Sequence, residues 1–324
     1  MTWSTDDAWQ AVLDPTTDVY FGPAYHALHQ TSSSTPCCFT LVDGSNQLLV
    51  AGMRTTIDGS DAFDLQTCNG YGGPLARGDS KFLAEAWAAW KLAAKRERIV
   101  AALFRLHPLL DQRPWLPPDA TVRHERETVF VDLTDGLEAA WNRADGRHRN
   151  MVQRARREGA SVQSDPAGWP AFITLYRAAM DRLGAAESLR FSDTYFSRLC
   201  AHGSVELLSL SDARGVASAA VMLWGPQWGH YHLAARRHDA PNYAANLVLQ
   251  VAIERAQQRG LSGIHLGGGT TNASDDSLLR FKRSLGGRAQ PFHVARVIAD
   301  PEAFEALVAR RGGSPTWLLG YRQP

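Results

Sequence analysis

The order of apolar patterns restricts the fold of this chain more than any other feature of its sequence, because the same order occurs in both halves. Apolar runs of about four to eight residues bounded by turn residues are typical of buried strands, and apolar residues three or four positions apart predict helices. The first half contains two strand-like runs within residues 37–57, a helix over about 80–98, and strands over 99–108 and 127–135. The second half contains helices over 136–158 and 167–183, a three-strand meander over 204–236, a helix over 242–259, a strand over 263–269, a helix over 275–285 and a strand over 290–298.

Each half therefore has a hairpin or meander, then a helix, then a strand. This order predicts an α/β protein of two tandem domains, with mixed sheets flanked by helices. We expect the first domain at residues 1–135 and the second at 136–300, with a basic inter-domain helix at the start of the second. The tail, 301–324, contains the apolar run 317–319, which needs burial, so we expect the tail to pack on the first domain.

The composition is that of an ordinary globular protein, with 44% hydrophobic and 21% charged residues in a chain of 324. A net charge of +1 excludes a strongly basic nucleic-acid-binding protein. No apolar run approaches the roughly 20 residues that cross a bilayer, and the polar start MTWSTDDAWQ is unlike a signal peptide. We therefore predict a cytoplasmic protein without a membrane span. The four cysteines lack metal-ligand spacing, which predicts reduced core thiols and no metal site.

Positive charge is concentrated in one segment, WNRADGRHRNMVQRARREG, at residues 141–159. This segment contains six arginines and one histidine, but only one aspartate and one glutamate. Two interpretations stay open. The segment is either the solvated face of a helix, or a contact to phosphates, which requires several cations close together.

Four features of the second half occur in a recognisable order and resemble the Fem peptidyltransferases, the FemAB-like branch of the GNAT superfamily. They are a basic helix preceded by Trp141, a strand that ends in HYHLAA (230–235), a helix that starts PNYAAN (241–246), and HLGGGTTNASDDSLLRFKRSLGG (265–287). The YGGP at 71–74 resembles a Gly-Pro loop in the first domain of the same family. The resemblance implies two tandem GNAT-like domains. It also implies an amide-forming enzyme that moves an amino acid from aminoacyl-tRNA to a small amine, a peptide or a cell-wall precursor.

Lys282 is the first predicted catalytic residue, because the resemblance implies that the pair Phe281-Lys282 lies beside the aminoacyl end of the donor. An ammonium there would either stabilise the oxyanionic tetrahedral intermediate of aminolysis or hold the terminal phosphate of the donor, and Phe281 would stack on its terminal adenine. The alternative is a solvated helix end with Phe281 in the core. His230 and His232 are the other catalytic candidates, because alternation along a strand places them on one face and Tyr231 on the other, and imidazoles relay protons near neutral pH.

The remaining site predictions concern binding. The predicted substrate-binding residues are Tyr71, Tyr231, Arg237, Tyr243, Asn246, Gly268 and Phe281, and the predicted tRNA-binding residues are Arg147, Arg149, Arg154 and Arg157. The run Gly267–Gly269 indicates a close backbone approach or a positive φ. Asp275 and Asp276 are typical of a helix N-terminus.

No cofactor is predicted. Coenzyme-A-dependent GNAT domains hold pyrophosphate on backbone amides of a glycine-containing turn, whereas the stretch RRHDAPNYAAN (236–246) has no glycine, and Pro241 lacks an N–H. We therefore expect an aminoacyl-tRNA-dependent transferase. The alternatives are an acyl-CoA-dependent N-acyltransferase and a non-catalytic tRNA- or glycan-binding module.

Overall fold

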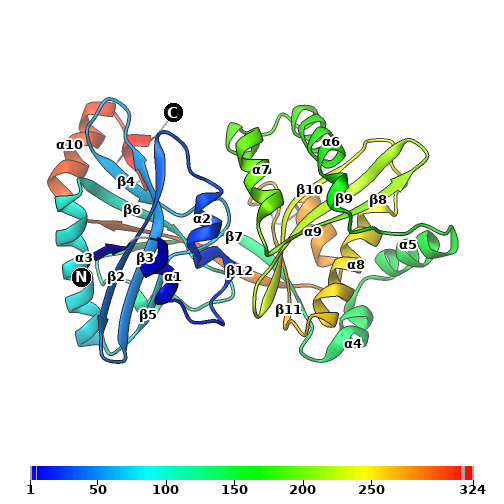
Figure 1. Cartoon of the computed structure of the whole chain (residues 1–324), viewed down its shortest axis with the longest axis horizontal. Coiled ribbons are helices and arrows are strands. Elements are labelled where there is room, and N and C mark those ends of the chain that lie inside the picture. Colours follow the sequence, from blue (N-terminus) through cyan, green and yellow to red (C-terminus); the bar gives the residue numbers. More distant parts are fainter. Residues whose placement is uncertain (1, 5, 274, 315–317, 323–324) are drawn as a thin grey trace. The chain divides into compact units, whose positions relative to one another are not determined.

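The computed structural model describes residues 2–4, 6–273, 275–314 and 318–322, which form two compact units (Figure 1). The first unit comprises Met1–Asp14, Tyr20–Arg126 and Pro291–Pro324, and the second comprises Pro15–Val19 and Glu127–Gln290. The chain passes between the units inside two strands, β7 (Thr121–Asp132) and β12 (Arg288–Ile298). The chain also passes between the units at Asp14–Pro15 and at Val19–Tyr20. The domain boundary expected at residue 135 lies just after β7 and stays a prediction.

The first unit is an α/β body built on a mixed sheet. Its strands follow the order β1-β2-β3-β4-β6-β12, with β5 also paired to β3. β4 and β6 are parallel, whereas the β2–β3 and β6–β12 pairs are antiparallel. Its elements are β1 (Thr2–Ser4), α1 (Asp6–Ala11), α2 (Pro23–Ala27), β2 (Ser34–Asp43), β3 (Asn46–Thr56), β4 (Phe63–Gln66), β5 (Pro74–Arg77), α3 (Ser80–Arg96), β6 (Ile99–Arg105) and α10 (Pro301–Arg311).

The helix α3 forms where the apolar spacing predicts it. Asp79 caps its N-terminus by accepting a 2.8 Å hydrogen bond from the amide of Phe82. Phe82, Trp87 and Trp90 are buried on one side of the helix, against the sheet residues of the first unit. Burial of this apolar face stabilises the helix more than its intrinsic propensity does.

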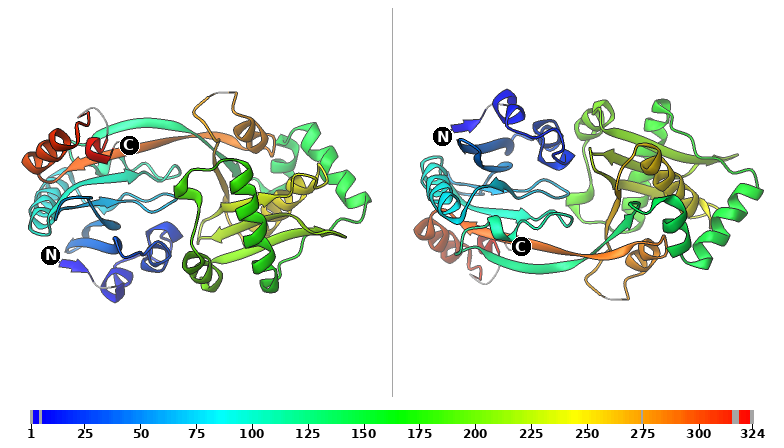
Figure 2. Two further views of the ribbon diagram at one scale, coloured as in Figure 1. Left: turned by 90° about the horizontal axis from the view of Figure 1, so that it is seen from above. Right: turned by 90° about the horizontal axis from the view of Figure 1, so that it is seen from below.

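The C-terminal segment belongs to the first unit. The helix α10 packs on β6 (Figure 2). Phe304 and Val308 of α10, Val100 of β6 and Leu319 form one buried cluster. Arg322 then pairs with the fully buried Asp64 at 2.5 Å. Trp317 and its neighbours at 315 and 316 lie outside the described residues.

The second unit is also α/β, with strand order β7-β11-β10-β9-β8. β11 and β10 are parallel, whereas the other neighbouring strands are antiparallel. Its elements are α4 (Gly136–Arg143), α5 (Gly146–Arg157), α6 (Trp169–Arg182), α7 (Asp193–Ala201), β8 (Val205–Asp212), β9 (Gly215–Trp224), β10 (Trp228–Arg236), α8 (Ala244–Gln258), β11 (Gly263–Gly268) and α9 (Ser277–Arg283). None of the helices in the described part of the chain has the length and apolarity to cross a membrane.

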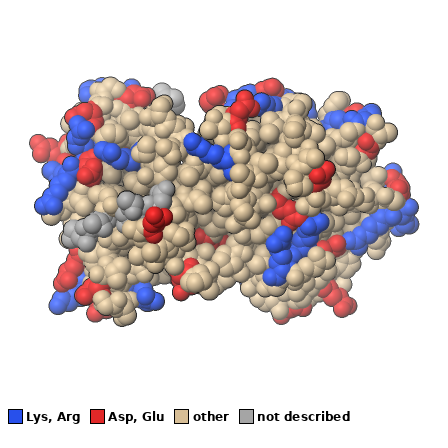
Figure 3. Space-filling view, in the orientation of Figure 1, with Lys and Arg blue, Asp and Glu red and all other residues tan. Residues whose placement is uncertain are grey.

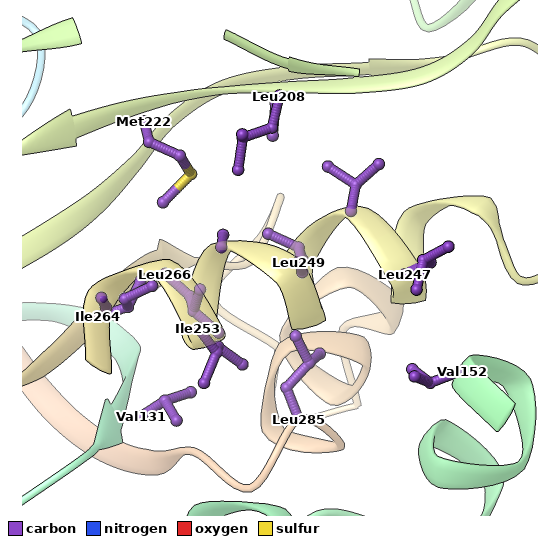
Figure 4. Packing of buried hydrophobic residues seen from close by; sticks show 14 of the residues in the cluster. Val131, Val152, Leu208, Met222, Leu247, Leu249, Ile253, Ile264, Leu266 and Leu285 are labelled. Atoms are coloured by element: carbon purple, nitrogen blue, oxygen red, sulfur yellow. The ribbon is translucent and has the colours of Figure 1, made fainter. Parts of the chain in front are cut away.

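A large core lies between the sheet of the second unit and α8 (Figure 4). Leu249 and Ile253 of α8 are buried with Met222 of β9 and Ile264 of β11, and Leu285 closes the cluster after α9. The helices α6 and α7 pack on the strands β8 to β10 as well. The unit is thus a layered α/β sandwich, with β10 and β11 at the centre of its sheet.

The predicted helix over 136–158 is two helices. The chain leaves helical geometry at Ala144 and Asp145, where ψ is 148° and 146°. Arg149 of α5 donates hydrogen bonds to the carbonyls of Asn142 and Ala144, which satisfies acceptors at the end of α4. The basic segment therefore turns between the two helices, because this turn lets both of them pack on α8.

Candidate functional site

The strands β10 and β11 separate, and this separation defines the candidate site in the second unit. Within the described chain they pair in parallel as far as His230↔His265. β10 then continues to Arg236 and β11 to Gly268, each paired with its outer neighbour, β9 or β7. The separation opens a gap in the hydrogen-bond ladder, into which a side chain or ligand group can enter.

Each of the two strands carries an irregularity at this point. The register of β10 against β9 shifts between Tyr231 and Leu233, and that of β11 against β7 shifts between His265 and Gly267. Gly267 has a φ of 71°, a left-handed conformation that glycine adopts without steric cost. Irregularities of this kind bend a strand, so they account for the separation. Part of the expectation for the glycine run, a positive φ, is confirmed at Gly267.

Lys282 of α9 enters this gap. Its Nζ donates a 2.6 Å hydrogen bond to the carbonyl of Gly268 on β11, and lies 5.5 Å from the ring centre of Tyr231 on β10. The residue is only 6% exposed. Burial lowers the pKa of Lys282 to about 7, because desolvation disfavours the ammonium form. Lys282 is thus not at a solvated helix end, although Phe281 packs against the core as that alternative expects.

Asp276 organises the turn between β11 and α9. Its Oδ1 accepts a 2.8 Å bond from the amide of Leu279, which caps α9, and its Oδ2 accepts bonds from the amides of Thr270 and Thr271 at 3.0 and 2.9 Å. These hydrogen bonds, the one from Leu279 first, hold the pKa of Asp276 at about 2. A Cβ at Gly269 would lie 2.4 Å from Oδ1, so the carboxylate requires glycine there. Ser274, in the same turn, lies outside the described residues.

His230 has an acidic partner that the sequence patterns do not reveal. Its Nε2 lies 2.7 Å from Oδ2 of Asp18, and both side chains are about 1% exposed. A carboxylate on one ring nitrogen fixes the orientation of the imidazole. Its strand neighbour His265 is held in turn by the hydroxyl of Thr128, at 2.9 Å. No local signal links Asp18 to a residue 212 positions later.

His232 faces away from Lys282. Its Nε2 lies 2.6 Å from the hydroxyl of Tyr195 on α7, whereas Tyr231 faces α9, as strand alternation predicts. Burial, with smaller contributions from His230 and His202, lowers the pKa of His232 to about 3. A relay has to exchange protons near the working pH. A histidine with so low a pKa is neutral at that pH, and the catalytic role of His232 stays a prediction.

Four of the predicted binding residues have other surroundings. Arg237 bridges two aspartates, 212 and 239, at 2.5 Å each. The amide of Asn246 lies 2.9 Å from Nδ1 of the buried His148. Tyr243 is 8% exposed and lies beneath the guanidinium of Arg154. Tyr71 belongs to the first unit, where its ring contacts Phe292 and Tyr20. These contacts are internal, so the binding roles of the four residues stay predictions.

The basic helix α5 is amphipathic. His148, Val152 and Ala155 are buried, and the predicted arginines 147, 154 and 157 lie on the opposite, exposed face. Figure 3 shows basic side chains gathered over α5. Arg154 forms an ion pair with Glu158 at 2.6 Å, and Arg149 donates a hydrogen bond to the carbonyl of Ala144 at the end of α4. Arg147 and Arg157 have no ion-pair partner among the described residues and are the two that offer a free guanidinium.

A separate cavity of about 350 Å³ lies beside α4. Its charges are already paired, because Arg288 contacts Asp132 at 2.9 Å and Arg143 lies 4.0 Å from Asp135. It contains none of the predicted site residues. Its lining residues are Phe130, Asp132, Asp135, Arg143, Gly286, Gly287 and Arg288.

The second unit is similar to a known protein family, and the whole chain is similar to solved structures. Residues 146–283 match the family described as "Acetyltransferase (GNAT) domain". A search for curated relatives by sequence finds no significant match. The crystal structure of FemX is similar over 94% of this chain and 98% of its own, with a TM-score of 0.73 and 12% identity.

Two further structures are similar to this chain at lower scores. The C-terminal domain of a putative lysylphosphatidylglycerol synthetase from Agrobacterium fabrum has a TM-score of 0.55 and 14% identity, over 85% of this chain and 87% of that one. L-PGS from Bacillus licheniformis has a TM-score of 0.52 and 13% identity, over 88% and 90%. Residues 146–283 are thus similar to a GNAT domain, and the chain as a whole has a fold like that of FemX.

Proposed function

We propose that this chain transfers an aminoacyl group from aminoacyl-tRNA to the amine of a small molecule or peptide. The observation that carries the proposal is the buried Lys282 in the gap between β10 and β11, with its pKa lowered to about 7. A lysine in water is almost fully protonated at neutral pH. One that titrates near 7 is suited to accept and return a proton within a reaction cycle.

The chemistry follows from the two states of the amine. The acceptor nitrogen attacks the ester carbonyl of the donor, a C–N bond forms and the carbonyl oxygen becomes an oxyanion. Neutral Lys282 takes the proton that the nitrogen loses, and the resulting ammonium stabilises the adjacent oxyanion. When the C–O bond to the ribose breaks, the same proton passes to the leaving oxygen. The products are an amide and a free tRNA hydroxyl, and Lys282 is neutral again.

Two observations favour tRNA over an acyl-CoA donor. The amides before α8 are poor ligands for a pyrophosphate, because Pro241 has no N–H and the amide of Ala244 donates to the carbonyl of Pro241 at 3.0 Å. The exposed guanidinium groups of Arg147 and Arg157, in contrast, suit an extended phosphate backbone. The matched family is described as an acetyltransferase domain, so acyl-CoA-dependent N-acyl transfer is the second candidate.

The test is a single-turnover transfer assay with charged tRNA and with acetyl-CoA, using a panel of primary amines and short peptides as acceptors. We expect labelled amide from charged tRNA. Lys282→Met should lower the rate by about 10²–10³-fold with little change in donor binding, the range for loss of one oxyanion donor. Transfer from acetyl-CoA alone would favour the second candidate, and transfer from neither donor would favour a non-catalytic binding module.

A further inference from the structure

We propose that Asp276 is the positioning residue for Lys282, and that its carboxylate sets the position and the charge state of the lysine amine. This inference rests on the proposed function, which makes Lys282 the acid–base group. The carboxylate of Asp276 bonds to the turn after β11 and to the first turn of α9. It therefore acts through the turn and the helix that carry Lys282.

The first part of the argument is geometric. The carboxylate of Asp276 holds both ends of the turn, because one oxygen accepts from Thr270 and Thr271 and the other accepts from Leu279. The turn begins directly after Gly268, whose carbonyl accepts the Lys282 hydrogen bond. Asp276 therefore fixes α9, which carries the lysine, against the strand end that provides the acceptor.

The second part is electrostatic. Among the described residues, the Lys282 amine contacts the ring of Tyr231 from β10 and the carbonyl of Gly268 from β11, and Asp276 caps the start of α9. The other ionisable groups of α9, Arg280 and Arg283, are cations and cannot stabilise an ammonium. His265 on β11 is turned to Thr128.

In the part of the chain that the structure describes, Asp276 is the charged group that raises the pKa of Lys282, and it opposes the larger effect of burial. An anion with a pKa near 2 keeps its charge at every pH at which the lysine titrates. Its field is thus constant over this range. The balance between burial and this field sets the pKa of the Lys282 amine at about 7.

The neighbouring Asp275 provides a matched control. It is exposed, whereas Asp276 is 8% exposed and accepts all the hydrogen bonds given above. The variant Asp276→Asn removes the charge and leaves a good helix cap, and Asp276→Ser does the same with a smaller side chain. Asp275→Asn removes the same charge one residue away without removing those hydrogen bonds.

The experiment is an NMR titration of the lysine Hε–Cε resonances, which needs no substrate. The chain has four lysines, at positions 81, 91, 95 and 282, so the spectrum is simple, and Lys282→Met assigns the relevant peak. We expect the titration of Lys282 to move to lower pH by on the order of one unit in the Asn and Ser variants, and to stay unchanged in Asp275→Asn.

A second measurement connects the titration to the reaction. The single-turnover rate of the wild type should rise with pH to a plateau, with its midpoint at about pH 7, since neutral Lys282 accepts the proton. The midpoint should move down with the NMR titration in both Asp276 variants. A Lys282 titration that stays in place in folded Asn and Ser variants, or one that moves equally in Asp275→Asn, would overturn the inference. A shifted titration with no transfer from any donor would instead leave the inference intact and refute the proposed function.

Discussion

The buried amine of Lys282 makes a quantitative prediction about the stability of the fold. In the unfolded chain lysine has its ordinary pKa near 10.5, and in the folded chain that of Lys282 is about 7. Between these two values the unfolded state binds the additional proton, so the free energy of unfolding rises with pH. The contribution is most unfavourable below pH 7, and disappears above about pH 10.5.

The magnitude follows from the difference between the two pKa values. Each pKa unit corresponds to about 1.4 kcal/mol. Burial of the amine therefore lowers the free energy of unfolding by about 4 kcal/mol at pH 7 and by about 1.5 kcal/mol at pH 9.5. Lys282→Met keeps an unbranched side chain of similar length and removes the charge. The stability gain of the Met variant over wild type should therefore shrink by about 3 kcal/mol between pH 7 and 9.5.

Urea unfolding at five pH values in this range, followed by circular dichroism, measures the difference. Lys81→Met is the matched control, because Lys81 is exposed at the start of α3. We expect the Lys81 difference to be independent of pH. If the Lys282→Met difference is equally constant, the amine titrates in the folded state as it does in water, and both the burial argument and the acid–base role of Lys282 fail.

Two further predictions concern the second unit. Replacing Arg147 and Arg157 together by Ala should reduce the slope of log K against log salt by about two units, where K is the association constant for tRNA, because the variant neutralises two fewer phosphates. Filter binding at several salt concentrations measures this slope. An unchanged slope would identify α5 as a solvated face. Gly287→Ala should destabilise the unit by about 1–3 kcal/mol, because its Cβ would lie 2.2 Å from a methyl of Val129. Thermal melts of the variants measure this loss. Gly203→Ala is the control, because its Cβ would meet open space, and its stability should be close to that of the wild type.

The elements of the fold that sequence patterns predicted are those with a long local signal. α3 and the β2–β3 hairpin lie within a few residues of their predicted bounds, since apolar period and turn residues act over short stretches. The four-residue strands β4 and β5 were missed, because so short a segment has no period to detect. Their strand conformation depends on pairing with β3, which is tertiary.

The candidate site was predictable in part for the same reason. The pair Phe281-Lys282 and the aromatic end of β10 were recognisable, and strand alternation placed Tyr231 opposite His232 correctly. The burial of Lys282 was not predictable, because the local sequence RFKRS is as polar as any exposed helix end. The partnership of Asp18 with His230 was equally hidden, since it depends on a distant segment that belongs to the second unit.

The passage of the chain through β7 and β12 has a consequence for synthesis on the ribosome. The continuous stretch Glu127–Gln290, which is nearly the whole second unit, is synthesised before the residues that follow it. The first unit contains the N-terminal residues, yet it still lacks β12, α10 and the arginine that pairs with Asp64. The first unit is therefore started before the second and completed after it, and its early strands stay without β12 and α10 until these are synthesised.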